Sequence, residues 1–164
     1  MPGTIVGLYT AEAAGEPVMS HAEVEVVAGL GIPGDRYATG RGYWSDPRWP
    51  DQELTFAAAE VAETIGLEPA LLRRNVVTRG VDLDALIGVT FRAGTALLQG
   101  VRRCDPCGHL DSLTRPGVAR ALRERGGLRT RVLASGRIAV GDRIEPAALT
   151  PRTSPATASE TASE

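Results

Sequence analysis

The sequence predicts one α+β domain that is mainly β, a barrel with two or three short helices. Two observations support this prediction: short apolar and β-branched segments follow one another, and Gly, Pro, Asn and Asp residues separate them at short intervals. A chain of 164 residues buries about 70% of its unfolded surface in a single core. We expect residues 1–148 to form this domain and residues 149–164, rich in Thr, Ser, Ala, Pro and Glu, to be a disordered polar tail.

The N-terminal half contains two expected strands, a long loop and the best helix candidate. Residues 4–9 are apolar and β-branched, and residues 23–29 alternate Val with Glu as a half-buried strand does. Residues 29–52 are dense in Gly and Pro, which predicts a loop. Residues 54–69 predict a helix that Thr55 caps and Gly66 ends.

The C-terminal half predicts five short strands and one short helix. The expected segments are a strand at 75–80, two strands in 88–102 with a turn at Gly94, a helix at 117–127 ended by a double glycine, and two strands in 130–145 around Ser135 and Gly136.

Composition excludes several functional classes. A formal net charge of −2 and 4% aromatic residues argue against nucleic-acid binding, which needs clustered positive charge and stacking surfaces. The sequence shows no signal peptide and no apolar run of the roughly 20 residues that a membrane span needs, so we expect a cytoplasmic protein. All 18 basic residues are arginine, and a chain without lysine cannot bind pyridoxal phosphate as a Schiff base.

The segment RRCDPCGHL, residues 102–110, holds both cysteines, Cys104 and Cys107, together with His109. Three uses of this segment remain open from its chemistry. A zinc site would need a fourth ligand such as His21 or Asp111, and a dithiol switch would need the Cys-x-x-Cys motif at a helix N-terminus after a strand. A single functional thiolate is favoured by the neighbouring arginines and by a helix start near Gly108, because both lower the pKa of a thiol.

An ordered set of motifs resembles the MOSC domain family, named after the C-terminal domain of molybdenum cofactor sulfurase. The motifs are GLGIPGDRYA, LRRNVVTRGVDLDALIG, FRAGTALLQGVRRCDPCGHL and GGLRTRVLASGRIAVGD, and the resemblance spans roughly residues 4–145. The resemblance implies a stand-alone MOSC-type β-barrel that binds the molybdenum cofactor.

The resemblance also assigns residues. The signature cysteine of the family follows a proline and falls on Cys107, which would ligate molybdenum or carry a persulfide. The family's cofactor-binding Arg-x-Asn falls on Arg73 and Asn75, and its glycine-rich loop falls on Gly34, Asp35 and Arg36.

The chemistry of these side chains agrees with that assignment. Arg36, Arg73, Arg74 and Arg129 would hold the phosphate of the cofactor, although each arginine taken singly is more often a solvated surface charge. Asn75 offers donors and an acceptor to a pterin edge, and Asp35 would orient an arginine of its loop or cap a turn.

Relatives of this family reduce N-hydroxylated compounds or deliver sulfur, which suggests two functions beside a non-catalytic module in which Cys104, Cys107 and His109 bind zinc. The first is a small molybdoenzyme that reduces N–O bonds in a small-molecule substrate, with Cys107 on the metal, His109 as a proton donor and an electron-donor protein as partner. The alternative is a metal-free persulfide carrier supplied by a cysteine desulfurase, in which Cys104 resolves the persulfide on Cys107.

Overall fold

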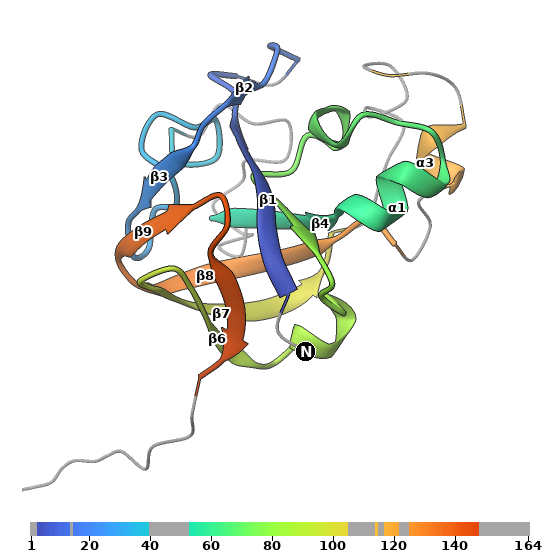
Figure 1. Cartoon of the computed structure of the whole chain (residues 1–164). Coiled ribbons are helices and arrows are strands. Elements are labelled where there is room, and N and C mark those ends of the chain that lie inside the picture. Colours follow the sequence, from blue (N-terminus) through green and yellow to red (C-terminus); the bar gives the residue numbers. More distant parts are fainter. Residues whose placement is uncertain are drawn as a thin grey trace, which may run out of the picture.

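The computed structural model describes residues 3–13, 15–39, 53–104, 114, 117–121 and 125–147. Within these residues the chain forms a closed β-barrel with few short helices, which confirms the predicted fold class (Figure 1). The expected tail at 149–164 lies outside the described residues.

The barrel wall consists of seven strands, and the pairing of β10 with β1 closes the ring. In order around the ring the strands are β10 (Arg143–Pro146), β6 (Thr90–Ala93), β7 (Ala96–Arg103), β8 (Leu128–Ala134), β4 (Leu54–Ala58), β5 (Val76–Arg79) and β1 (Gly3–Thr10). The short strand β2 (Met19–Ser20) pairs with the end of β1, and β3 (Glu23–Val26) pairs with β9 (Gly136–Ala139) as a separate ribbon beside the barrel (Figure 1).

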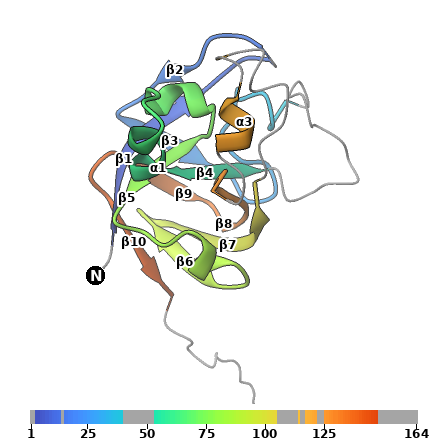
Figure 2. The ribbon, with the colours of Figure 1, turned by 90° about the vertical axis from the view of Figure 1, so that its right-hand side faces the viewer.

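The helices are short and fill the connections between strands. The parallel pair β4–β5 needs a crossover connection, which α1 (Ala59–Thr64) and the 3₁₀ turn η1 (Pro69–Leu72) supply. The 3₁₀ turn η2 (Asp84–Leu86) precedes β6, and α3 (Val118–Ala121) lies between β7 and β8 in the chain. Figure 2 shows α1 and α3 at the same end of the barrel. None of the described helices is long and apolar enough to cross a membrane.

Alternation along the strands places one set of side chains in the barrel interior. This core includes Phe56 and Phe91, whose rings meet edge to face with centroids 5.7 Å apart. A second, smaller cluster seals the helical end, and its members are Ala57, Ala62, Leu67, Leu72 and Val118.

The largest error of the sequence prediction concerns residues 54–69. Residues Leu54–Ala58 form the fully paired strand β4, and the helix begins only at Ala59. Thr55 therefore caps nothing. The apolar residues of this segment fit a helix stripe, but pairing with β5 and β8 on both sides determines the structure.

Other boundaries differ less. The strand expected at 23–29 ends at Val26, and the segment 130–145 holds parts of three strands because β9 and β10 separate at Gly141. The turn at Gly94 is confirmed, as are the break between two strands at Ser135 and the loop over residues 29–39. The rest of that expected loop, residues 40–52, lies outside the described residues, as does part of the helix expected at 117–127.

Candidate functional site

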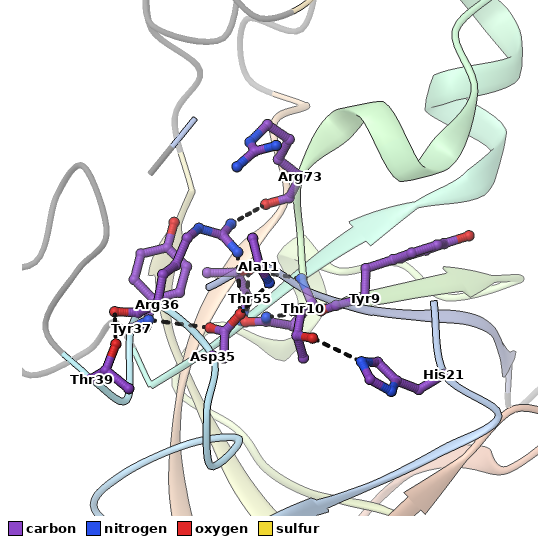
Figure 3. Close-up of polar contacts among 11 residues, drawn as sticks. Tyr9, Thr10, Ala11, His21, Asp35, Arg36, Tyr37, Thr39, Thr55 and Arg73 are labelled. Atoms are coloured by element: carbon purple, nitrogen blue, oxygen red, sulfur yellow. Dashed lines mark hydrogen bonds and ion pairs between the residues drawn. The ribbon is translucent and has the colours of Figure 1, made fainter. Parts of the chain in front are cut away.

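The loop containing Asp35 and Arg36 docks on the end of β1. The Arg36 backbone N–H donates to the Ala11 carbonyl (2.8 Å), and Asp35 Oδ1 accepts from the Ala11 N–H (3.0 Å). Asp35, 1% exposed, also accepts from the backbone N–H of Tyr37 and from Arg36 Nη1, both at 3.2 Å (Figure 3). Gly34 precedes it at φ +88°, which glycine adopts without strain. Asp35 therefore both closes the turn and neutralises Arg36.

Arg36 connects this loop to the Arg73 turn. Its guanidinium is buried, lies over the Tyr37 ring at 4.5 Å from the centroid, and donates from Nη2 to the Arg73 carbonyl oxygen at 2.7 Å. Both Nη atoms of Arg36 thus have partners within the chain (Figure 3). We infer that Arg36 holds the site together rather than binding a ligand with these atoms.

Arg73 has the features of a ligand-binding residue. It ends η1 in the left-handed conformation (φ 59°, ψ 36°), the one non-glycine residue with positive φ in the described part of the chain. Its Nη2 atom is buried and has no hydrogen-bond partner there. Burial, and then the neighbouring Arg36 cation, lower the pKa of Arg73, with weaker opposition from Tyr37, Asp35 and Glu16. A cation that is disfavoured in the free protein gains most from an incoming anion.

Asn75 is fully buried and bonded within the barrel wall. Its Oδ1 accepts from the backbone N–H (3.1 Å) and the hydroxyl (3.2 Å) of Thr55, and its Nδ2 donates to the Tyr9 carbonyl (3.1 Å). The Thr55 hydroxyl in turn accepts from the Asn75 N–H at 3.1 Å. Asn75 therefore fastens β5 to β4 and β1, and this network occupies its acceptor, which leaves little of the side chain for a ligand.

Arg74 points to three backbone carbonyls. Its Nε donates to Gly126 (3.0 Å), Nη1 to Leu72 (3.4 Å) and Nη2 to Cys104 (3.3 Å). The Arg74 side chain is 9% exposed and has no carboxylate among these contacts. It joins the turn before β5, the end of β7 and the chain entering β8.

Arg129 lies on β8 beside the Asn75–Thr55 pair. In the strand register Thr55 is opposite Arg129, and Arg129 is opposite Arg102 on β7, so the three positions form one row across the sheet. Arg129 is 7% exposed, and its Nε atom is buried without a hydrogen-bond partner among the described residues. Arg129 is thus the second arginine with an unused buried donor.

These side chains give the site an excess of positive charge. Arg36, Arg74 and Arg129 are buried and Arg73 is partly buried, whereas Asp35 is the one buried carboxylate among the described residues. Among the described residues, four arginines against one buried carboxylate leave an excess of three positive charges, which the exposed Glu16 beside Arg73 offsets only in part. The arrangement is therefore suited to a ligand with several negative charges.

Comparison with known proteins identifies the family of this chain. The family model described as the MOSC domain matches residues 49–145. The chain belongs to the MOSC domain family. A search of curated proteins found no significant match.

Solved structures of similar proteins show the same fold at low identity. The YuaD protein of Bacillus subtilis is 23% identical, with a TM-score of 0.72 over 89% of this chain and 96% of its own. YiiM of Escherichia coli is 21% identical, with a TM-score of 0.65 over 92% of this chain and 71% of its own. YiiM of Geobacillus stearothermophilus is 20% identical, with a TM-score of 0.66 over 89% and 75%.

The MOSC match contains most of the expected site. Within residues 49–145 lie Arg73, Arg74, Asn75, Cys104, Cys107, His109 and Arg129. The loop with Gly34, Asp35 and Arg36 precedes the matched range, yet the hydrogen bond from Arg36 to Arg73 brings it to the same place.

Of the cysteine segment of this MOSC protein, the structure describes the beginning. The Cys104 side chain is 3% exposed, its N–H donates to the Gly127 carbonyl (2.9 Å), and its own carbonyl accepts from Arg74. Cys107 and His109 lie outside the described residues. The described part of the chain contains no group of three or more His, Cys, Asp and Glu side chains suited to a metal ion.

The structure changes two expectations about individual side chains. The expectation that an arginine taken singly is a solvated surface charge is wrong for three residues, because Arg36, Arg74 and Arg129 are all buried. Thr55, expected as a helix cap, is the hydrogen-bond partner of Asn75, a role that becomes visible only once β4 is known to pair with β5. The sequence also gave no sign that His21 Nε2 lies 2.8 Å from the Thr10 hydroxyl at the end of β1.

Proposed function

We propose that this MOSC protein binds the molybdenum cofactor and reduces N-hydroxylated compounds. In this proposal Arg73 and Arg129 hold the phosphate of the cofactor, and Cys107 ligates the metal. The observation that supports it most directly is the pair of buried donors, Arg73 Nη2 and Arg129 Nε, that have no partner among the described residues.

The residues fit an anionic cofactor by their donor chemistry. Buried polar groups are almost always hydrogen-bonded, so a buried guanidinium donor without a partner suggests a ligand. Guanidinium groups bind phosphate with two parallel hydrogen bonds, and a phosphate monoester carries the multiple negative charge that the uncompensated arginines call for. Asn75 and Asp35 would contribute by holding the arginine-bearing turns.

The position of the signature cysteine in the chain is compatible with such a site. Arg74 and Gly127 hold the backbone of Cys104, and Cys107 follows three residues later. Three residues of extended chain cover at most about 11 Å. A cysteine thiolate is also the soft ligand that a thiophilic metal prefers.

When bound, the cofactor would supply the two-electron chemistry that reduces an N–O bond. The chain itself would bind and orient it: Arg73 and Arg129 would fix the phosphate end, and Arg36 and Arg74 would hold the backbone segments next to these two residues. His109 would donate one proton to the departing hydroxyl, which leaves as water, and the nitrogen would take the second proton from solvent; the first task is suited to the usual pKa range of histidine. Electrons would come from a donor protein.

Elemental analysis of protein purified from a host that makes molybdenum cofactor tests the proposal. We expect molybdenum and pterin near one per chain, and the loss of both in Cys107→Ser with little change in thermal stability. Cys104→Ser should have a milder effect. If the protein contained zinc in place of molybdenum, the cysteine segment would be a structural zinc site. A metal-free protein whose intact mass showed one extra sulfur atom would establish the persulfide carrier instead.

A further inference from the structure

Arg74 is a buried arginine of this site, and each of its three described hydrogen bonds goes to a backbone carbonyl. Its acceptors are the carbonyls of Leu72, Cys104 and Gly126, at 3.4, 3.3 and 3.0 Å. These carbonyls belong to three separate segments, so one side chain fixes three pieces of backbone relative to one another.

Two of these segments carry the arginines with unused donors. Leu72 directly precedes Arg73, which is itself the neighbour of Arg74 in the chain. Gly126 lies three residues before Arg129 and leads into β8. Fixing Leu72 and Gly126 on one guanidinium therefore sets the position of Arg73 relative to Arg129.

The charge of Arg74 is difficult to explain by hydrogen bonding alone. Its described partners are neutral carbonyls, so the buried cation is solvated by dipoles but not neutralised. Burying a charge that is not neutralised carries a free-energy cost. An anion held next to Arg74 by Arg73 and Arg129 would remove that cost.

We propose that Arg74 is the positioning residue of the anion site, which holds Arg73 and Arg129 at the separation that one phosphate group requires. The inference rests on the proposed function only in that Arg73 and Arg129 bind an anion. The planar fork of the guanidinium is essential, because an ammonium group is a point donor and cannot reach three divergent carbonyls.

Titration calorimetry with inorganic phosphate tests this role, using cofactor-free full-length protein at constant ionic strength and with chloride as the reference anion. We expect Arg73→Ala and Arg129→Ala each to weaken phosphate binding at least tenfold. Arg74→Gln and Arg74→Lys should do the same, although Arg74 itself does not touch the anion. Arg131→Gln, an exposed arginine on the same strand as Arg129, should stay within twofold of the parent protein.

Combined substitutions test whether the effect of Arg74 on binding passes through Arg73 and Arg129. In the Arg74→Lys background, adding Arg73→Ala or Arg129→Ala should cost less than threefold, because the geometry that made each contact effective is already lost. If these additions still cost tenfold, or if Arg74→Lys binds phosphate as the parent does, Arg74 does not position the pair and the inference is overturned.

Hydrogen exchange of the unsubstituted protein gives a reading that does not depend on the folding of any variant. Phosphate should slow exchange of the Cys104 amide, which donates to Gly127, at least tenfold although Cys104 itself is not a ligand. No slowing would count against the inference.

The outcomes also distinguish this inference from the proposed function. Phosphate binding that needs all three arginines in a protein that never acquires molybdenum would overturn the function and keep the inference. Molybdenum loading that needs Arg73 and Arg129 but not Arg74 would do the reverse. No phosphate binding at all would remove both the anion site and the role of Arg74.

Discussion

Arg36 donates a 2.7 Å hydrogen bond from Nη2 to the backbone carbonyl of Arg73, so two arginines 37 positions apart in sequence form one unit. Asp35 neutralises Arg36 at 3.2 Å. This arrangement leaves the Arg73 side chain as the partly buried cation of the unit with an unused donor. The loop with Asp35 and Arg36 therefore supports the turn, and the Arg73 side chain on that turn supplies the positive charge.

The first prediction concerns the buried carboxylate of this unit. Asp35→Asn should lower the free energy of unfolding by about 3 kcal/mol, because it leaves the buried Arg36 cation without a counter-charge. The amide also replaces one of the two oxygens that accept backbone hydrogen bonds from Ala11 and Tyr37. Urea denaturation at neutral pH measures the effect.

The matched control is Glu63→Gln, which removes an exposed carboxylate paired with Arg79 on the surface. Exposed pairs contribute little, so this variant should unfold almost as the parent does. Equal losses in the two variants would mean that the Asp35–Arg36 pair is not the anchor of the loop.

The second prediction concerns Gly127, where the chain enters β8. Its φ is +118°, and an added Cβ would lie 1.9 Å from the Phe56 carbonyl oxygen, far inside van der Waals contact. Gly127→Ala should therefore destabilise the protein by about 3 kcal/mol or more, since the backbone of β4 would have to move. It should also release Cys104, whose N–H donates to the Gly127 carbonyl.

Gly66→Ala provides the comparison, because Gly66 has φ +69° but no heavy atom within 4 Å of the added carbon. In this variant the free energy of unfolding should fall by only about 1 kcal/mol, the cost of placing alanine in a left-handed backbone conformation. Thermal unfolding distinguishes the two, and a Gly127→Ala protein no less stable than Gly66→Ala would contradict the close approach of β4 and β8.

The sequence predicted the barrel well because strand signals are local. The strands near residues 4–9 and 75–80 and the hairpin turn at Gly94 follow from β-branched runs and glycine positions. The strand β4 was missed because Phe56, Ala59, Ala62 and Ile65 follow one another at helical spacing. Nothing within that segment shows that β5 and β8 lie on either side of it.

The site was predicted by residue type but not by role. Motif resemblance selected Arg73 and Asn75, and the chemistry of guanidinium groups added Arg74 between them; the structure gives these three adjacent residues different tasks. Which arginine keeps a free donor depends on carbonyls that are distant in sequence, such as Gly126 for Arg74. Such pairings arise from the register of the closed barrel, which no single segment encodes.

The third prediction separates two unfavourable features of Arg73, its unsatisfied side-chain donor and its left-handed backbone conformation. Arg73→Ala should leave the stability of the cofactor-free protein within about 1 kcal/mol of the parent, because the lost side chain has an unsatisfied donor. Arg73→Gly should be more stable than Arg73→Ala by about 1 kcal/mol, since glycine accepts the left-handed backbone (φ 59°) without strain. Both variants should fail to acquire pterin and molybdenum.

Urea denaturation of cofactor-free protein measures the first two effects, and elemental and pterin analysis measures the third. A full cofactor complement in Arg73→Ala would remove Arg73 from the binding site. If Arg73→Gly were less stable than Arg73→Ala, the left-handed turn would not be the conformation of this residue in solution.

The fourth prediction concerns Arg129, whose Nε is buried without a partner in the described part of the chain. Arg129→Met keeps most of the volume and removes the charge, so the cofactor-free protein should gain roughly 1–2 kcal/mol of stability. Binding of the anionic cofactor should be lost, because the same donor that destabilises the empty protein is the one that would bind phosphate. Stability and binding are thus expected to change in opposite directions at this residue.

Arg131→Met is the control two residues along β8, where the side chain is exposed and the same chemical change should leave both stability and cofactor content nearly unchanged. Thermal unfolding of cofactor-free protein, beside molybdenum and pterin content of protein from a cofactor-producing host, measures both properties. If Arg129→Met lost stability while keeping its cofactor, Arg129 would be a structural residue of the barrel wall, and Arg73 alone would remain as the phosphate ligand.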